Sequence, residues 1–159
     1  MNINQITHSQ LVEAVTLVYD EDSSCRILRA GNWKNKDNKE IKKHNGIVYF
    51  ISVNDEVVKI GGSSTTIGKL IGQYLINLES KAEPRENRFC LHLRILSHLV
   101  RGDVVKYHFI PVEDMVTYCE GMFGETLTAN HREFRIVESR LIEQFVMSEG
   151  SVPVWNNSE

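Results

Sequence analysis

The sequence predicts one α+β domain, built from a small antiparallel β-sheet with helices packed against it. Three observations predict this class: a β-hairpin signature, apolar residues at helical spacing after it, and a length that suits a single domain. The chain has 159 residues, of which 42% are hydrophobic and 25% charged, enough to bury a real core. We expect an N-terminal helix and a basic arm over 1–45, and the compact core of the domain over 46–159.

The β-hairpin is the clearest local signal. Two short apolar runs, Gly46–Val53 and Glu56–Gly61, flank a turn-prone Asn-Asp pair at 54–55, which is typical of two antiparallel strands joined by a tight turn. Because side chains alternate along a strand, Tyr49 and Lys59 are expected to lie across from each other. A phenol next to an ammonium group has a lowered pKa, which makes it a candidate base or nucleophile.

The other elements follow from the spacing of apolar residues. An apolar stripe from Leu11 to Val18 predicts a short helix capped by Ser9. The run Gly61–Ser64 is expected to be a flexible turn, whereas Met115–Asn130 has only a weak pattern. The remaining patterns predict a helix that begins near Thr66, helices over Asn87–Arg101 and Arg132–Ser148, and a third strand over Val104–Val112. The core order is then β-β-α-α-β-α, which favours a layered α+β sandwich.

Charge and cysteine content narrow the class of protein. The formal net charge of -3 does not indicate a nucleic-acid binder, so any phosphate-binding surface requires local clustering. Such a cluster lies in the N-terminal arm, where a solvated lysine-rich loop is the alternative interpretation. Its cations are Arg26, Arg29, Lys34, Lys36, Lys39, Lys42 and Lys43.

The cysteines Cys25, Cys90 and Cys119 are far apart and odd in number. This spacing matches neither a zinc site nor a disulfide framework, which predicts a reducing compartment and a cytoplasmic protein. No apolar run is long enough to span a membrane. The first residues lack the basic and apolar regions of a secretory signal.

Two segments of the hairpin carry a resemblance to a known family. The run Gly46-Ile47-Val48-Tyr49, followed ten residues after the tyrosine by Lys59-Ile60-Gly61, resembles the core of the GIY-YIG nucleases. Lysine stands where most of that family carries its second tyrosine. A branch of type II restriction endonucleases shares this departure.

The resemblance implies further site residues in the second half of the chain. Glu138 corresponds to the glutamate that binds the metal ion, Mg²⁺ or Mn²⁺, since magnesium is commonly held by one carboxylate, phosphate oxygens and waters. Glu143 is the competing carboxylate on the same helix. We prefer Glu138, because its helix face is the one that must meet the sheet. Asn156 resembles the terminal asparagine that ties the closing segment to the active site, and a simple turn residue is the alternative.

The resemblance is imperfect at the phosphate contact. The family usually carries an arginine about ten residues beyond the second motif, whereas this chain has Lys69 there. Lysine offers one compact charge where arginine forks onto two oxygens. Tyr74 matches a tyrosine that lines the site in the lysine-bearing branch, and Arg85 or Arg88 is an alternative source of a guanidinium group.

The implied activity is a metal-dependent DNA endonuclease that hydrolyses phosphodiester bonds in double-stranded DNA, most like a sequence-specific type II restriction enzyme. Two alternatives stay open: a phage or defence-system nuclease of relaxed specificity, and a catalytically silent DNA-binding protein on the same fold. The expected partners are DNA and a second copy of the chain, since one active site cuts one strand. The residues expected to contact DNA are Lys34, Lys36, Lys42, Lys43 and Arg88.

Overall fold

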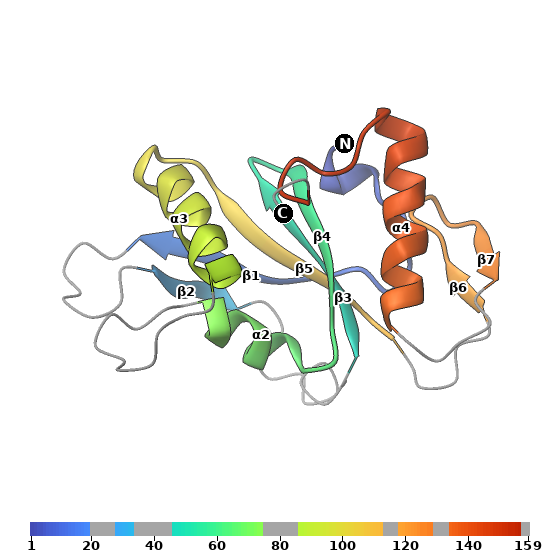
Figure 1. Ribbon diagram of the computed structural model, residues 1–159, viewed down its shortest axis with the longest axis horizontal. Helices are drawn as coiled ribbons and strands as arrows, with labels where there is room; N and C mark the ends of the chain where they lie inside the picture. The colour runs from blue at the N-terminus through green and yellow to red at the C-terminus, as the bar shows by residue number, and fades with distance from the viewer. Residues whose placement is uncertain (20–27, 34–45, 75–85, 113–117, 129–133, 157–159) are drawn as a thin grey trace.

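The computed structural model confirms the predicted α+β class, with an antiparallel sheet between helices (Figure 1). It describes residues 1–19, 28–33, 46–74, 86–112, 118–128 and 134–156. The elements in these ranges are η1 (Ile3–Gln5), β1 (Val12–Tyr19), β2 (Leu28–Trp33), β3 (Ile47–Val53), β4 (Glu56–Ser63), α2 (Ile67–Tyr74), α3 (Glu86–Val100), β5 (Val105–Pro111), β6 (Tyr118–Glu120), β7 (Thr126–Thr128) and α4 (Phe134–Glu149).

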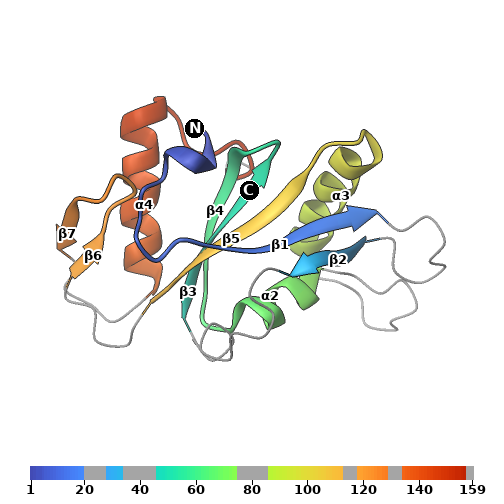
Figure 2. The same cartoon turned by 180° about the vertical axis from the view of Figure 1, so that it is seen from behind.

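The main sheet has five strands in the order β2-β1-β5-β3-β4, and every neighbouring pair is antiparallel. All seven residues of β3 are buried, because β5 and β4 flank this strand and helices cover it. Strand β4 forms one edge of the sheet. The short strands β6 and β7 pair separately, beside α4 (Figure 2).

Helices α2 and α3 lie on one face of the sheet and α4 lies on the other (Figures 1 and 2). Two apolar cores result, because alternate residues of β3 point to opposite faces. Tyr49 and Ile51 face α2 and α3, whereas Val48 and Phe50 face α4. The side of β3 that carries Tyr49 is therefore opposite to the side that receives α4.

The β3–β4 hairpin was predicted, but its register differs from the expected one. Both turn residues, Asn54 and Asp55, have positive φ angles of 49° and 67°, as a two-residue type I′ turn requires. A bulge between Ile51 and Ser52, with Val58 as the extra residue on β4, shifts the pairing, so that Tyr49 lies opposite Gly61 and Lys59 lies opposite Ile51. The expectation that Tyr49 and Lys59 lie directly across from each other is wrong.

The bulge still places Lys59 on the same face as Tyr49. Without the extra residue of the bulge, Lys59 would lie opposite Phe50, whose side chain faces α4. A shift of one residue moves every side chain of a strand to the other face of the sheet. With the bulge, Tyr49 and Lys59 are diagonal neighbours on adjacent strands, a separation of roughly 7–8 Å between backbones.

The predicted N-terminal helix is wrong, because Val12–Tyr19 forms β1. Its apolar residues include several valines, which favour strands, and β1 pairs with both β2 and β5. Residues 28–33, which were expected in the basic arm, also belong to the sheet, as β2. The rest of the expected basic arm, with Lys34, Lys36, Lys42 and Lys43, lies outside the described residues.

The later elements follow the prediction more closely. Helices α3 and α4 and strand β5 begin and end within two residues of the predicted bounds, and α2 begins at Ile67 as expected. The pair β6–β7 was missed, because three-residue strands are too short to show a period. Within the described ranges, no helix has the length and apolarity needed to cross a lipid bilayer.

Candidate active site

Tyr49 lies in the middle of β3, and its side chain is only 4% exposed. Its ring covers Gly61 on the neighbouring strand: a Cβ added to this glycine would lie 2.5 Å from both Cζ and Oη of Tyr49. The ring of Tyr107 supports it from β5, with a centroid separation of 6.1 Å. The phenol oxygen therefore lies over the backbone of β4 at Gly61.

The outer edge of β4 is closed at one position by Asn156. The Ile60 backbone N–H donates to Oδ1 of Asn156 at 3.0 Å, and Nδ2 of Asn156 donates to the Ile60 carbonyl oxygen at 2.7 Å. Trp155 adds a backbone hydrogen bond to the carbonyl oxygen of Val58 at 2.8 Å. The C-terminal segment thereby fixes β4 between Lys59 and Gly61.

Glu138 reaches the same edge from α4. In an edge strand, every second residue directs its backbone polar groups outward, and Gly62 follows Ile60 in this pattern. The Gly62 backbone N–H donates to the Glu138 carboxylate. A Cβ at Gly62 would collide with Oε2 of Glu138 and with the ring of Phe134, so this position also requires glycine.

Tyr49 and Glu138 therefore contact consecutive glycines of β4, Gly61 and Gly62, from opposite faces of the sheet. The run was expected to be a flexible turn, but both glycines belong to β4, and that expectation is wrong. Their lack of side chains lets a phenol and a carboxylate approach one short stretch of backbone.

Burial raises the pKa of the Glu138 carboxyl above its usual 4.5. The hydrogen bond from Gly62 and the positive charges of Lys59 and Arg135 oppose this rise without cancelling it. Lys59 and Arg135 are thus close enough to act on the carboxylate electrostatically. The site combines one partly desolvated carboxylate, one tyrosine and two cations.

Of the other residues expected to contact the phosphate, only Lys69 has a described side chain. Lys69 is exposed on α2, and among the described residues it makes no ion pair. Tyr74 ends α2 and Arg88 lies in the first turn of α3. The side chains of Tyr74 and Arg88, and all of Arg85, lie outside the described part of the chain.

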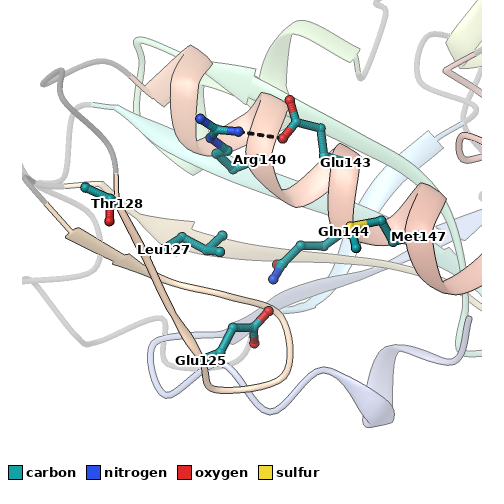
Figure 3. A pocket seen from close by; sticks show the side chains of 7 residues that line it. All are labelled: Glu125, Leu127, Thr128, Arg140, Glu143, Gln144 and Met147. Atoms are coloured by element: carbon teal, nitrogen blue, oxygen red, sulfur yellow. Dashed lines mark hydrogen bonds and ion pairs between the residues drawn. The ribbon is translucent and has the colours of Figure 1, made fainter.

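Glu143, the competing carboxylate, follows Glu138 by five residues and therefore lies on a different side of α4. It is exposed and pairs with Nη1 of Arg140 at 2.8 Å. Both residues line an open groove of about 460 Å³ between α4 and β7, which also includes Leu127 and Met147 (Figure 3). Of the two carboxylates, Glu138 is the one that contacts β4, where the charge of Lys59 acts on it.

Sequence reasoning missed three residues of this site: Gly62, Phe134 and Arg135. The glycine doublet was the available signal, because strands rarely carry consecutive glycines without a close approach. Phe134 and Arg135 carried no signal, since an aromatic residue and an arginine at the start of a helix are common.

Comparisons with known proteins bear on the fold. No protein-family model matches the sequence, and no curated protein sequence matches it. A mutant of bacteriophage T4 EndoII is similar in structure, with a TM-score of 0.58 and 21% sequence identity over 98% of this chain and 99% of that chain. The chain shares the fold of EndoII. The restriction endonuclease HPY188I in complex with product DNA has a TM-score of 0.46 and 21% identity, over 99% of this chain and 89% of that chain.

Replacing Glu138 with glutamine should stabilise the fold at neutral pH. Glutamine keeps an oxygen for the Gly62 N–H but removes the buried charge. Because the folded state raises this pKa, the carboxyl group's contribution to stability is fully present below its unfolded pKa and is lost as the pH rises through the folded pKa. The melting temperature of Glu138→Gln should exceed that of the wild type at pH 7, and the difference should shrink towards pH 4.

The matched control is Glu143→Gln, on the same helix. Its surface ion pair contributes about 0.5 kcal/mol or less, so its melting temperature should follow the wild type. Equal effects of the two substitutions at every pH would contradict a partly buried Glu138.

Gly61→Ala should destabilise the protein by about 1–3 kcal/mol, the usual range for overpacking a filled core. The new methyl group would overlap the buried ring of Tyr49. Gly68→Ala is the control, since a Cβ there meets nothing within 4 Å, and alanine in a helix is worth about 0.5–1 kcal/mol over glycine. Urea unfolding measures both, and a Gly61→Ala variant as stable as the wild type would contradict the packing described.

Proposed function

We propose that the protein is a DNA endonuclease of GIY-YIG type, which hydrolyses phosphodiester bonds in double-stranded DNA. The observation that carries the proposal is that Tyr49 covers Gly61 from one face of β4, and Glu138 contacts the next residue, Gly62, from the α4 side. The hairpin motifs lie on β3 and β4, where that resemblance requires them. The fold shared with EndoII, whose chain is matched almost completely, adds support.

Tyr49 is the candidate general base. Its Oη would take a proton from the attacking water, and the positive charge of Lys59 on the same face would favour the ionised phenol. The ring of Tyr107 and the backbone of Gly61 hold the phenol in place, so little reorganisation is needed when the substrate binds.

Glu138 is the candidate metal ligand. Among the described residues no three metal-ligating side chains cluster together, and a single carboxylate fits Mg²⁺ or Mn²⁺, which retain most of their waters and also bind substrate phosphates. Held by Glu138, such an ion would supply charge stabilisation for the leaving oxygen. The raised pKa of Glu138 implies that binding of the ion competes with a proton.

Other residues would hold the DNA. In this proposal Lys69 and Tyr74 contact the phosphate from α2. The DNA backbone would lie against Arg88 and the basic arm, that is, Lys34, Lys36, Lys42 and Lys43. Two copies of the chain, or two successive binding events, are needed to cut both strands. Sequence-specific restriction is the leading role. The whole-chain likeness to a phage protein favours a phage or defence nuclease of relaxed specificity as the second candidate.

The purified protein should convert supercoiled plasmid to nicked or linear DNA when Mg²⁺ is present and not when a chelator removes it. Tyr49→Phe should slow cleavage about 100-fold or more, in the range of a lost general base, with DNA binding unchanged. Tyr19→Phe is the control, since Tyr19 is exposed on β1, remote from β4. Sequencing of the cut ends distinguishes a restriction enzyme from a relaxed nuclease.

Absence of cleavage under all metal conditions, with DNA binding retained, would support the silent DNA-binding alternative. Cleavage by Tyr49→Phe at the wild-type rate would remove this tyrosine from the reaction.

A further inference from the structure

The first turn of α4 carries an arginine that the sequence motifs do not assign. Arg135 is exposed, and its Cζ lies 6.0 Å from the centroid of the Phe134 ring. The ring of Phe134 in turn fills the space above Gly62, beside Oε2 of Glu138. An aromatic ring at the candidate site therefore supports a guanidinium group next to it.

Arg135 and Glu138 are one helical turn apart, so their side chains lie on the same side of α4. Burial raises the pKa of Glu138 and the charge of Arg135 opposes this rise, yet among the described residues Arg135 makes no ion pair. Arg140 has the same spacing to Glu143 and does pair with it, at 2.8 Å. Arg135 is thus oriented by a ring, which leaves its N–H donors for another anion.

An arginine held over an aromatic ring suits phosphate recognition. The ring attracts the guanidinium group, and the fork of N–H donors matches two phosphate oxygens. Lys69, exposed on α2, offers only a single compact charge. A phosphate held at Gly61 and Gly62 would be bounded by Tyr49 from one face of the sheet and by the first turn of α4 from the other.

We propose that Arg135 is a catalytic residue, which binds two oxygens of the scissile phosphate and supplies the guanidinium group that α2 lacks. This rests on the proposed nuclease function. Arg135 neutralises the negative charge that builds on the phosphate oxygens while water attacks and the leaving oxygen departs. Lys69 then adds one compact positive charge to the same phosphate from α2.

The test compares Arg135→Ala, Arg135→Lys and Arg140→Ala in single-turnover cleavage of a DNA duplex at saturating Mg²⁺. Arg135→Ala should cut about 100-fold more slowly, as on deletion of one transition-state donor. Arg135→Lys should recover part of the rate, because it keeps the charge and loses the fork. Arg140→Ala, on the same helix but tied to Glu143, should cut at the wild-type rate.

Two further measurements distinguish a catalytic role of Arg135 from a role in packing or in general attraction of DNA. Binding of the duplex with Ca²⁺ in place of Mg²⁺ should be nearly equal in all three variants. Addition of millimolar methylguanidinium should accelerate Arg135→Ala and leave Arg140→Ala unchanged, which a merely structural role would not produce. If Arg135→Ala is unstable, the cleavage rate of Arg135→Lys is compared with those of Arg140→Ala and the wild type instead.

Wild-type protein that cuts DNA while Arg135→Ala cuts equally fast would overturn the role of Arg135 and leave the nuclease proposal intact. Equal slowing of Arg135→Ala and Arg140→Ala would also overturn it, since general surface charge would then be the cause. Wild-type protein that never cuts would instead overturn the nuclease function on which this role rests.

Discussion

At Gly61 and Gly62 the edge strand β4 has no side chains, and the phenol of Tyr49 and the carboxylate of Glu138 occupy the space that Cβ atoms would take. The rest of the candidate site depends on this constraint. Because consecutive residues of a strand face opposite sides, one glycine admits the tyrosine from the α2 and α3 face and the other admits α4. A larger residue at Gly61 would displace the Tyr49 ring, and one at Gly62 would displace the Glu138 carboxylate.

An exposed strand edge is normally prone to pair with other chains, and this protein protects the edge beside its site. Asn156 satisfies both backbone groups of Ile60, and Glu138 accepts the N–H of Gly62. The ring of Trp155 packs near His98 at a centroid separation of 5.6 Å, and Nδ1 of His98 lies 2.7 Å from Oδ2 of Asp103. The segment that closes the edge is therefore anchored to the end of α3.

The sequence was sufficient to predict those parts of the fold that depend on local signals. The Asn-Asp turn at 54–55 predicted the hairpin, and long periodic segments predicted α3 and α4. Strand β1 was misread because an apolar stripe of eight residues fits either a helix or a buried strand, and only pairing with β2 and β5 decides between them. Tyr49, Glu138 and Asn156 were found as candidates, but the bulge that sets the face of Lys59 and the place of Arg135 depend on tertiary packing.

The central claim is that Tyr49 and Glu138 act as one unit on one phosphate, and a double-mutant cycle tests it most directly. Single-turnover cleavage rates would be measured for the wild type, Tyr49→Phe, Glu138→Gln and the double variant, at saturating DNA and Mg²⁺. If the two groups form one site, the double variant should cut no more slowly than the slower single variant, since residues that act together are not additive. Losses that multiply, as they do for independent positions, would contradict a shared site at Gly61 and Gly62.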